Sequence, residues 1–313
     1  MKKISVVIPC YNEENSILDM YQRLCTVFRE NLENYHYEII YADDCSTDDT
    51  RKYIRKICKK DTKVKAVFNI RNFGFHRNVF ECFRYAAGDA VFMIFGDLQD
   101  PPEMLPDFVK KWEQGYQCIV GQRAASDESK WMQFMRRQYY TIIKFLSDKE
   151  QIALMNGFGL YDRKFIEILT EIEEVSPYLK AVIAEYGMNV SVVSYKQEVS
   201  KRGKSNFNFL KNYDFAMQGI TSSTKLLMRM ATFAGILIGI SSVLFSIYIF
   251  INKLINWNHY PIGTASVLVG VFFLGAVQLF FIGILGEYIL SINERVNRRP
   301  RIIIGEKINF REE

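Results

Sequence analysis

The 313-residue sequence lacks the spacings that mark several common binding sites. Its six cysteines include no CxxC pair, so no zinc site is predicted. Neither GxGxxG nor GxxxxGK followed by Ser or Thr occurs, which leaves classical dinucleotide and P-loop phosphate binding without support. No internal repeat, low-complexity stretch or nucleic-acid motif is present. With 49% apolar and 24% charged residues, the chain is neither disordered nor a disulfide-rich miniprotein.

Charge is almost absent from one long stretch. Residues 232–286 carry a single charged side chain, Lys253, although the whole chain has 75. About 20 apolar residues cross the hydrocarbon core of a bilayer. The sequence therefore predicts two transmembrane helices, at about 231–252 and 262–286, and a buried helical hairpin is the alternative. The mean hydropathy of −0.05 averages this stretch with a polar domain.

Basic residues flank the predicted hairpin. Lys225 and Arg229 precede it, and Arg295, Arg298, Arg299 and Arg301 follow it. The positive-inside rule places both termini in the cytoplasm, where the six cysteines stay reduced. The predicted parts are a catalytic domain (1–206), an amphipathic basic juxtamembrane segment (207–229), two membrane helices (230–290) and a cytoplasmic tail (291–313).

Net charge is concentrated just before the first predicted membrane helix. Residues 196–229 hold seven Lys or Arg and two Asp or Glu, and the difference of +5 equals the net charge of the whole chain. A basic segment beside a membrane attracts anionic lipid head groups. Charge that only sets topology is the alternative, less so for Arg202 and Lys204.

Strand and helix patterns alternate through the first 125 residues. The expected strands are residues 4–9, 37–42, 64–68, 90–95 and 118–121, and the expected helices are 16–30, 47–60, 77–87 and 101–114. Such alternation predicts an α/β fold with a mostly parallel sheet covered by helices on both faces. Ligands bind such sheets beyond the carboxyl ends of the strands.

Acidic residues follow two of these strands. Asp43 and Asp44 end one strand, where carboxylates accept hydrogen bonds from a base edge or a ribose, although acids here also favour a helix N-terminus. Asp97 and Gln99 follow another and offer two oxygen ligands to a hard divalent cation. Asp100 precedes two prolines, which is strong turn chemistry.

The motifs VVIPCYNEE, DDCSTDDT and GDLQDPPE, in this order and spacing, resemble family 2 glycosyltransferases of the GT-A fold. DLQDPPE with a C-terminal pair of predicted spans is similar to the polyprenyl-phosphate branch, which includes bactoprenol glucosyltransferases and dolichyl-phosphate mannose synthases. The absence of a QxxRW motif argues against a processive polysaccharide synthase.

The resemblance implies roles for individual residues. Catalysis is expected from Asp97, Asp100 and Arg123, and Mg²⁺ or Mn²⁺ binding from Asp97 and Gln99. The nucleotide sugar is expected to contact Pro9, Tyr11, Glu13, Asp43, Asp44, Arg71 and Asp97. The acceptor and its phosphate are expected to contact Arg123, Asn156, Arg202 and Lys204.

Two positions depart from the family pattern. Many members have DAD where Phe95, Gly96 and Asp97 stand here, which predicts weaker metal binding. Many also have an acid where Asn156 stands, and an enzyme that activates a hydroxyl needs such a base.

The resemblance implies an inverting transfer of a sugar, glucose first, from a UDP-sugar to a polyprenyl phosphate such as undecaprenyl phosphate. The expected location is the cytoplasmic face of a bacterial inner membrane. Two alternatives remain: a glycolipid or polymer hydroxyl acceptor, and a non-catalytic nucleotide-sugar-binding membrane partner. No nucleic-acid partner is expected, and homo-oligomerisation is left open.

Overall fold

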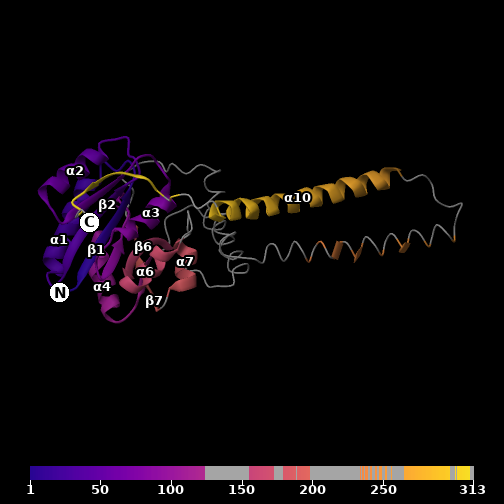
Figure 1. The fold of residues 1–313 in the computed structure, drawn as a ribbon. Coiled ribbons are helices and arrows are strands. Elements are labelled where there is room, and N and C mark those ends of the chain that lie inside the picture. The colour runs from indigo at the N-terminus through magenta and orange to yellow at the C-terminus, as the bar shows by residue number, and fades with distance from the viewer. Residues whose placement is uncertain are drawn as a thin grey trace.

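The computed structural model describes residues 1–123, 155–172, 179–187, 189–197, 264–296, 300 and 302–310, with isolated positions between 233 and 255 (Figure 1). The predicted juxtamembrane segment 207–229 lies outside these described residues, as do Arg202 and Lys204. Only scattered positions of the first predicted membrane helix are described.

Within the part of the chain that the structure describes, eight strands form one sheet in the order β7-β5-β6-β4-β1-β2-β3-β8. They are β1 (Lys3–Cys10), β2 (His36–Asp43), β3 (Val64–Asn69), β4 (Ala90–Met93), β5 (Cys118–Arg123), β6 (Met155–Asp162), β7 (Val190–Tyr195) and β8 (Ile304–Ile308). Of these described strands, β6 and β8 pair antiparallel to their neighbours and the others pair in parallel, so the predicted mostly parallel α/β sheet is confirmed.

Helices cover both faces of this sheet because the central strands are apolar on both sides. The helices of the domain are α1 (Ile17–Asn31), α2 (Thr50–Lys60), α3 (Phe75–Arg84), the short 3₁₀ helix η1 (Pro102–Met104), α4 (Leu105–Glu113), α6 (Arg163–Glu171) and α7 (Leu179–Tyr186). One core lies between the sheet and α1, α2 and α4. The other lies between the sheet and α3, α6 and α7. Alternate β1 residues divide between them: Val6 and Ile8 belong to the first core and Val7 to the second.

The strand directions gather one set of loops at a single edge. Strands β1, β2, β3, β4, β5 and β7 all end there, because β5 and β4 each run antiparallel to β6, which lies between them. The antiparallel strands β6 and β8 begin at the same edge. This places Asn156, near the start of β6, beside the ends of the parallel strands.

A buried carboxylate ties three of the strands together at the opposite end of the sheet. Glu38 is 2% exposed and accepts hydrogen bonds from Ser5 Oγ at 2.6 Å and the Ala87 backbone N–H at 2.9 Å. Its other oxygen lies 2.8 Å from the ammonium groups of Lys3 and Lys65. Burial alone would raise the pKa of Glu38, but these partners lower it to about 2. Glu38 is therefore charged throughout the physiological range.

Element boundaries differ from prediction where polar loops replace expected helix or strand turns. The helix expected from residue 47 begins at Thr50, because residues 44–49 form a loop in which Asp48 accepts the Thr50 N–H at 3.0 Å. The strand expected to reach Phe95 ends at Met93. Strands β6, β7 and β8 were not predicted.

Helix α10 (Thr264–Val296) covers residues 264–286 of the second predicted membrane helix and extends away from the α/β domain (Figure 1). Among the described residues, no helix qualifies as long and apolar enough to cross a membrane. The two-span hairpin therefore stays a prediction. Residues 304–308, expected in a tail, instead form β8 on the outer edge of β3.

Candidate active site

Loops after β1, β2 and β4 are joined at the carboxyl edge of the sheet. Asn12 has a positive φ of 57°, and its backbone N–H donates to Ser46 Oγ at 2.9 Å. The Asn12 side chain accepts the Thr47 N–H at 2.8 Å. Ser16 Oγ donates to the Gly96 carbonyl at 2.6 Å, which fixes the loop before Asp97. Of the predicted ligands, Pro9 lies near the end of β1, and Tyr11 and Glu13 lie on the loop that follows, which is held against both acidic segments.

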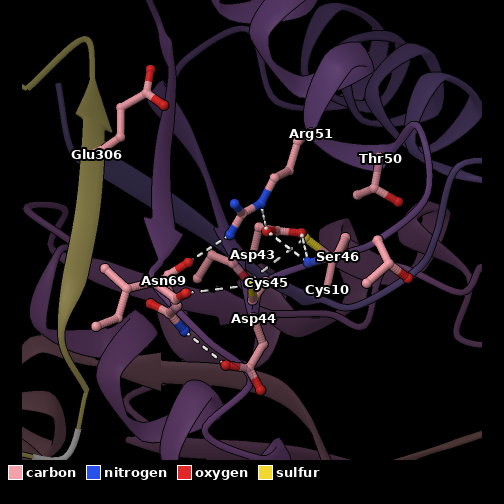
Figure 2. Close-up of polar contacts among 12 residues, drawn as sticks. Cys10, Asp43, Asp44, Cys45, Ser46, Thr50, Arg51, Asn69 and Glu306 are labelled. Carbon is pink, nitrogen blue, oxygen red and sulfur yellow. Dashed lines mark hydrogen bonds and ion pairs between the residues drawn. The ribbon is translucent and has the colours of Figure 1, made fainter.

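Asp43 is completely buried and lies at the end of β2. Its carboxylate accepts hydrogen bonds from Arg51 Nε and from the Ser46 backbone N–H, the latter at 3.1 Å. Arg51, in the first turn of α2, also donates from Nη2 to the Asn69 carbonyl at 2.6 Å (Figure 2). Arg51 therefore connects the end of β2 to the end of β3.

The neighbouring Asp44 shapes the next loop. Its carboxylate accepts the Asn69 side-chain amide and the backbone N–H groups of Phe73 and Gly74, each at 2.9 Å. Burial raises the pKa of Asp44, and these three hydrogen bonds oppose the rise. The loop between Asn69 and Gly74 carries Arg71, which is exposed and lies 4.9 Å from the Phe73 ring centroid. Asp44 thus holds the loop that presents Arg71.

Asp97 follows β4 in a tight turn. Its Oδ1 accepts the Gln99 N–H at 3.1 Å, and Leu98 between them has a positive φ of 57°. Asp97 and Gln99 are both half-buried, and Gln99 Oε1 accepts a hydrogen bond from the Gln197 side chain at 2.7 Å.

The donor set at this turn fits a divalent cation in part. The Asp97 carboxylate is a hard oxygen ligand of the kind that Mg²⁺ and Mn²⁺ bind through one or two protein groups. Within the described residues, no group of three His, Cys, Asp or Glu side chains could hold a metal. An ion held by Asp97 and by the predicted ligand Gln99 would therefore take its remaining ligands from substrate phosphates and water.

Asp100 and Arg123 are linked through Tyr195, which the sequence reasoning did not single out. Asp100 is fully buried and accepts a hydrogen bond from the Tyr195 hydroxyl. Burial and the nearby Asp100 charge raise the pKa of Tyr195, while the Arg123 guanidinium opposes this. Arg123 and Tyr195 are register partners at the ends of β5 and β7. The three side chains connect the Asp97 turn to the ends of β5 and β7.

An aromatic pair borders the Asp97 turn where many family members have an acid. The Phe95 ring lies 5.4 Å from the ring of Phe75, which is 49% exposed at the start of α3. Beside them, burial and the charge of Lys180 lower the pKa of His76 to about 4, so this imidazole is neutral at pH 7.

The structure thus brings most predicted residues to one edge: Pro9, Tyr11, Glu13, Asp43, Asp44, Arg71, Asp97, Gln99, Asp100, Arg123 and Asn156. Sequence reasoning missed Arg51, Asn69 and Tyr195. Arg51 stands eight residues after Asp43 in an expected helix, and that pairing of a cation with an acid was the available signal.

Comparison with known proteins agrees with this geometry. Residues 5–187, more than half of the chain, match the family model "Glycosyl transferase family 2". A bactoprenol glucosyl transferase from a prophage of Shigella flexneri is 33% identical over 304 residues, covering 96% of this chain and 97% of that protein. The putative glycosyltransferase CsbB of Bacillus subtilis is 31% identical, covering 97% of this chain and 91% of its own length.

Solved structures agree on the fold. Glucosyl-3-phosphoglycerate synthase from Mycobacterium tuberculosis, solved with phosphoglyceric acid, superposes with a TM-score of 0.52 at 20% identity, over 71% of this chain and 78% of that one. The same enzyme with Mn²⁺, uridine diphosphate and phosphoglyceric acid gives a TM-score of 0.51 at 19% identity, over 71% and 77% of the two chains. The chain belongs to glycosyl transferase family 2, and it is a glycosyltransferase with the GT-A fold.

Proposed function

We propose that this enzyme transfers a sugar, with glucose as the first candidate, from a UDP-sugar to a polyprenyl phosphate such as undecaprenyl phosphate. The observation that carries the proposal is the extent of the similarity to bactoprenol glucosyl transferases. It spans 96% of this chain and so continues beyond the family domain into the apolar C-terminal part. A transferase that resembled these enzymes only in its sugar-nucleotide domain would not share that part.

The chemistry of a phosphate acceptor suits the side chains at the strand ends. A phosphate monoester has a second pKa near 6, so it is mostly a dianion at pH 7 and is already nucleophilic. An enzyme using it needs alignment and charge stabilisation more than a general base. The presence of Asn156 where many relatives have an acid is compatible with such an acceptor.

The donor half of the reaction is assigned to the loops after β1 to β4. Asp43, held by Arg51, and the Arg71 loop, held by Asp44, are proposed to receive the nucleotide. Asp97 would hold Mg²⁺ or Mn²⁺, which would neutralise charge on the diphosphate leaving group. Arg123, at the end of β5, is proposed to face the acceptor phosphate. The displacement would invert the configuration at the anomeric carbon.

A membrane location is also proposed, because α10 presents exposed apolar side chains. Among the α10 side chains that the structure describes, Val267, Val271, Leu279 and Ile282 are each more than 60% exposed. Exposed apolar surface of this extent marks a contact with another apolar phase or protein. We propose that this phase is the interior of a bacterial inner membrane. The catalytic domain would lie on its cytoplasmic side, with the two spans predicted by sequence as the anchor.

The proposal is tested by supplying the purified full-length enzyme with radiolabelled UDP-glucose, undecaprenyl phosphate and Mg²⁺ or Mn²⁺ in detergent. A labelled lipid that requires both the acceptor and the divalent ion is expected. A parallel series with other UDP- and GDP-sugars identifies the sugar. If none of these donors yields a lipid-linked sugar, or if label enters only a glycolipid or polymer hydroxyl, the proposed acceptor is wrong.

A further inference from the structure

The last strand of the chain lies beside the proposed donor site. Strand β8 pairs antiparallel with β3, so it begins at the edge of the sheet where β3 ends. Asn69 is opposite Ile304, and the Ile70 backbone N–H donates to the Ile303 carbonyl at 3.1 Å. The C-terminal segment thereby contacts the start of the loop that presents Arg71.

Ile70 lies between two residues already placed at the site. On one side Asn69 accepts from Arg51 through its carbonyl and donates to Asp44 through its side chain. On the other side is Arg71. The Ile70 carbonyl also accepts a weak hydrogen bond from Cys45 Sγ at 3.6 Å. The contact with Ile303 therefore helps to set the backbone path from Asn69 to Arg71.

A second contact joins β8 to the helix that carries Arg51. Glu306 in β8 lies 2.6 Å from Arg55 Nη2. Arg55 and Arg51 are one turn apart in α2, and both lie over the Phe68 ring of β3, at 4.6 Å and 5.4 Å from its centroid. Figure 2 shows Glu306 on β8, the yellow strand, which runs beside the Asp43 and Asp44 cluster. Strand β8 therefore bears on the arginine side of the Asp43 cluster as well.

A third contact fixes β8 at its other end. The Asn309 side-chain amide donates to the carbonyls of Cys58, in α2, and Val64, in β3, at 2.8 Å and 2.7 Å. Strand β8 thus bridges the two elements, α2 and β3, that carry Arg51 and Asn69.

From these contacts we propose that β8 is a positioning element of the donor site, which holds the Asn69–Arg71 backbone in the conformation that binds the nucleotide. This inference rests on the proposed function, because it assumes that the nucleotide occupies the loops after β2 and β3. If β8 served only to cover the edge of β3, pairing at any position along β3 would be sufficient. That role would not require contacts to the Arg51 helix and to Ile70.

Strand β8 follows the apolar helix α10 in the sequence. Helix α10 ends at Val296 and β8 begins at Ile304, so the positioning strand directly follows the apolar helix. Residues that follow the proposed membrane anchor in the sequence thereby contact the loop of the proposed donor site.

Gly305→Val is the sharpest probe of this role. A Cβ at Gly305 would lie 3.1 Å from Ile70 Cγ2, so valine presses on the loop from β8 without touching the site. Lys307→Ala is the matched control on the same strand, because Lys307 faces the rings of Tyr85 and Phe310. The readouts are UDP affinity by calorimetry, donor KM and kcat, urea unfolding, and hydrogen exchange of the Ile70 amide.

Gly305→Val is expected to weaken UDP binding and raise the donor KM about three- to tenfold, with kcat and the unfolding midpoint unchanged. The Ile70 amide should exchange faster, and Lys307→Ala should match wild type. If Gly305→Val proves unstable, the surface pair provides a second test: Arg55→Glu and Glu306→Arg alone should each raise the KM, and the double exchange should restore it.

The outcomes separate this inference from the proposed function. If Gly305→Val and both single charge reversals bind UDP as tightly as the wild-type enzyme, the proposed role of β8 is wrong and the proposed donor stands. A wild-type enzyme that binds no UDP would overturn both. A parallel fall in stability and kcat without a change in KM would reduce β8 to a structural edge strand.

Discussion

At the scale of single residues, the candidate site depends on how buried charges are paired. Asp43 has no exposed surface, and its carboxylate is compensated by Arg51, whose side chain is 25% exposed. Removing one partner of a buried pair leaves an uncompensated charge, which costs more than the pair itself contributes. Sequence reasoning identified Asp43 from its motif but missed Arg51, because the pairing depends on how α2 packs against the sheet.

Arg51→Ala should destabilise the domain as well as weaken donor binding. The loss in free energy of unfolding is expected to be about 3–5 kcal/mol, because Asp43 stays buried without its cation. Lys52→Ala is the neighbouring control, since Lys52 and its partner Asp49 are both exposed, and it should leave the free energy of unfolding close to that of wild type. Urea unfolding followed by tryptophan fluorescence measures both. Equal stabilities of the two variants would show that Arg51 does not compensate Asp43.

Asp97→Asn should lower turnover without unfolding the protein. The substitution keeps the side-chain oxygen that accepts the Gln99 N–H but removes the charge that a divalent ion needs. Loss of one such electrostatic group lowers kcat by about 100-fold or more. Asp107→Asn, on the exposed face of α4, is the control and should retain full activity. The assay is transfer of labelled sugar at saturating donor, and a variant within a few-fold of wild type would remove Asp97 from the proposed metal site.

At the scale of elements, the alternation of apolar and polar segments predicted the parallel strands and their covering helices well. Local pattern was enough for β1 and β2, whose residues are apolar on both faces and end in polar loops. It was not enough for β6, where glycines at 157 and 159 interrupt the apolar pattern. Gly159 is required because a Cβ there would lie 2.3 Å from the Ile119 carbonyl on β5. The need for that glycine arises only once the two strands are paired.

The Glu38 cluster should make stability depend on acid pH. The pKa of Glu38 is lowered in the folded protein to about 2, below its ordinary value near 4.3. Its stabilising contribution is therefore complete above about pH 4.3 and is lost as the pH falls towards 2. Urea midpoints measured between pH 7 and pH 2.5 should fall more steeply in wild type than in Glu38→Gln.

The control for this experiment is Glu30→Gln. Glu30 pairs with Arg29 on the surface, where both side chains are more than half exposed. The urea midpoints of Glu30→Gln should fall with pH as steeply as those of wild type. The same acid slope in wild type and Glu38→Gln would mean that Glu38 is not the group that titrates.

At the scale of the whole molecule, two parts of the chain that are far apart in sequence build one sheet. The N-terminal residues build the sheet from β1 to β3, and the segment after α10 returns to add β8 at its edge (Figure 1). Composition predicted the apolar segment and the basic stretch before it. It predicted residues 291–313 as a tail, because a five-residue strand with alternating exposure has little pattern of its own. Its place is defined by pairing with β3 and by its contacts with α2, which appear only in the folded chain.

The central claim is that the sugar alone moves from the nucleotide to a lipid phosphate. The most direct measurement is the identity of the released nucleotide, together with the mass of the lipid formed from UDP-glucose and undecaprenyl phosphate. We expect UDP in a one-to-one ratio with a lipid that has gained one hexose and still holds one phosphorus atom. Release of UMP, with a lipid that holds two phosphorus atoms, would contradict the account, because the enzyme would then be transferring a sugar phosphate.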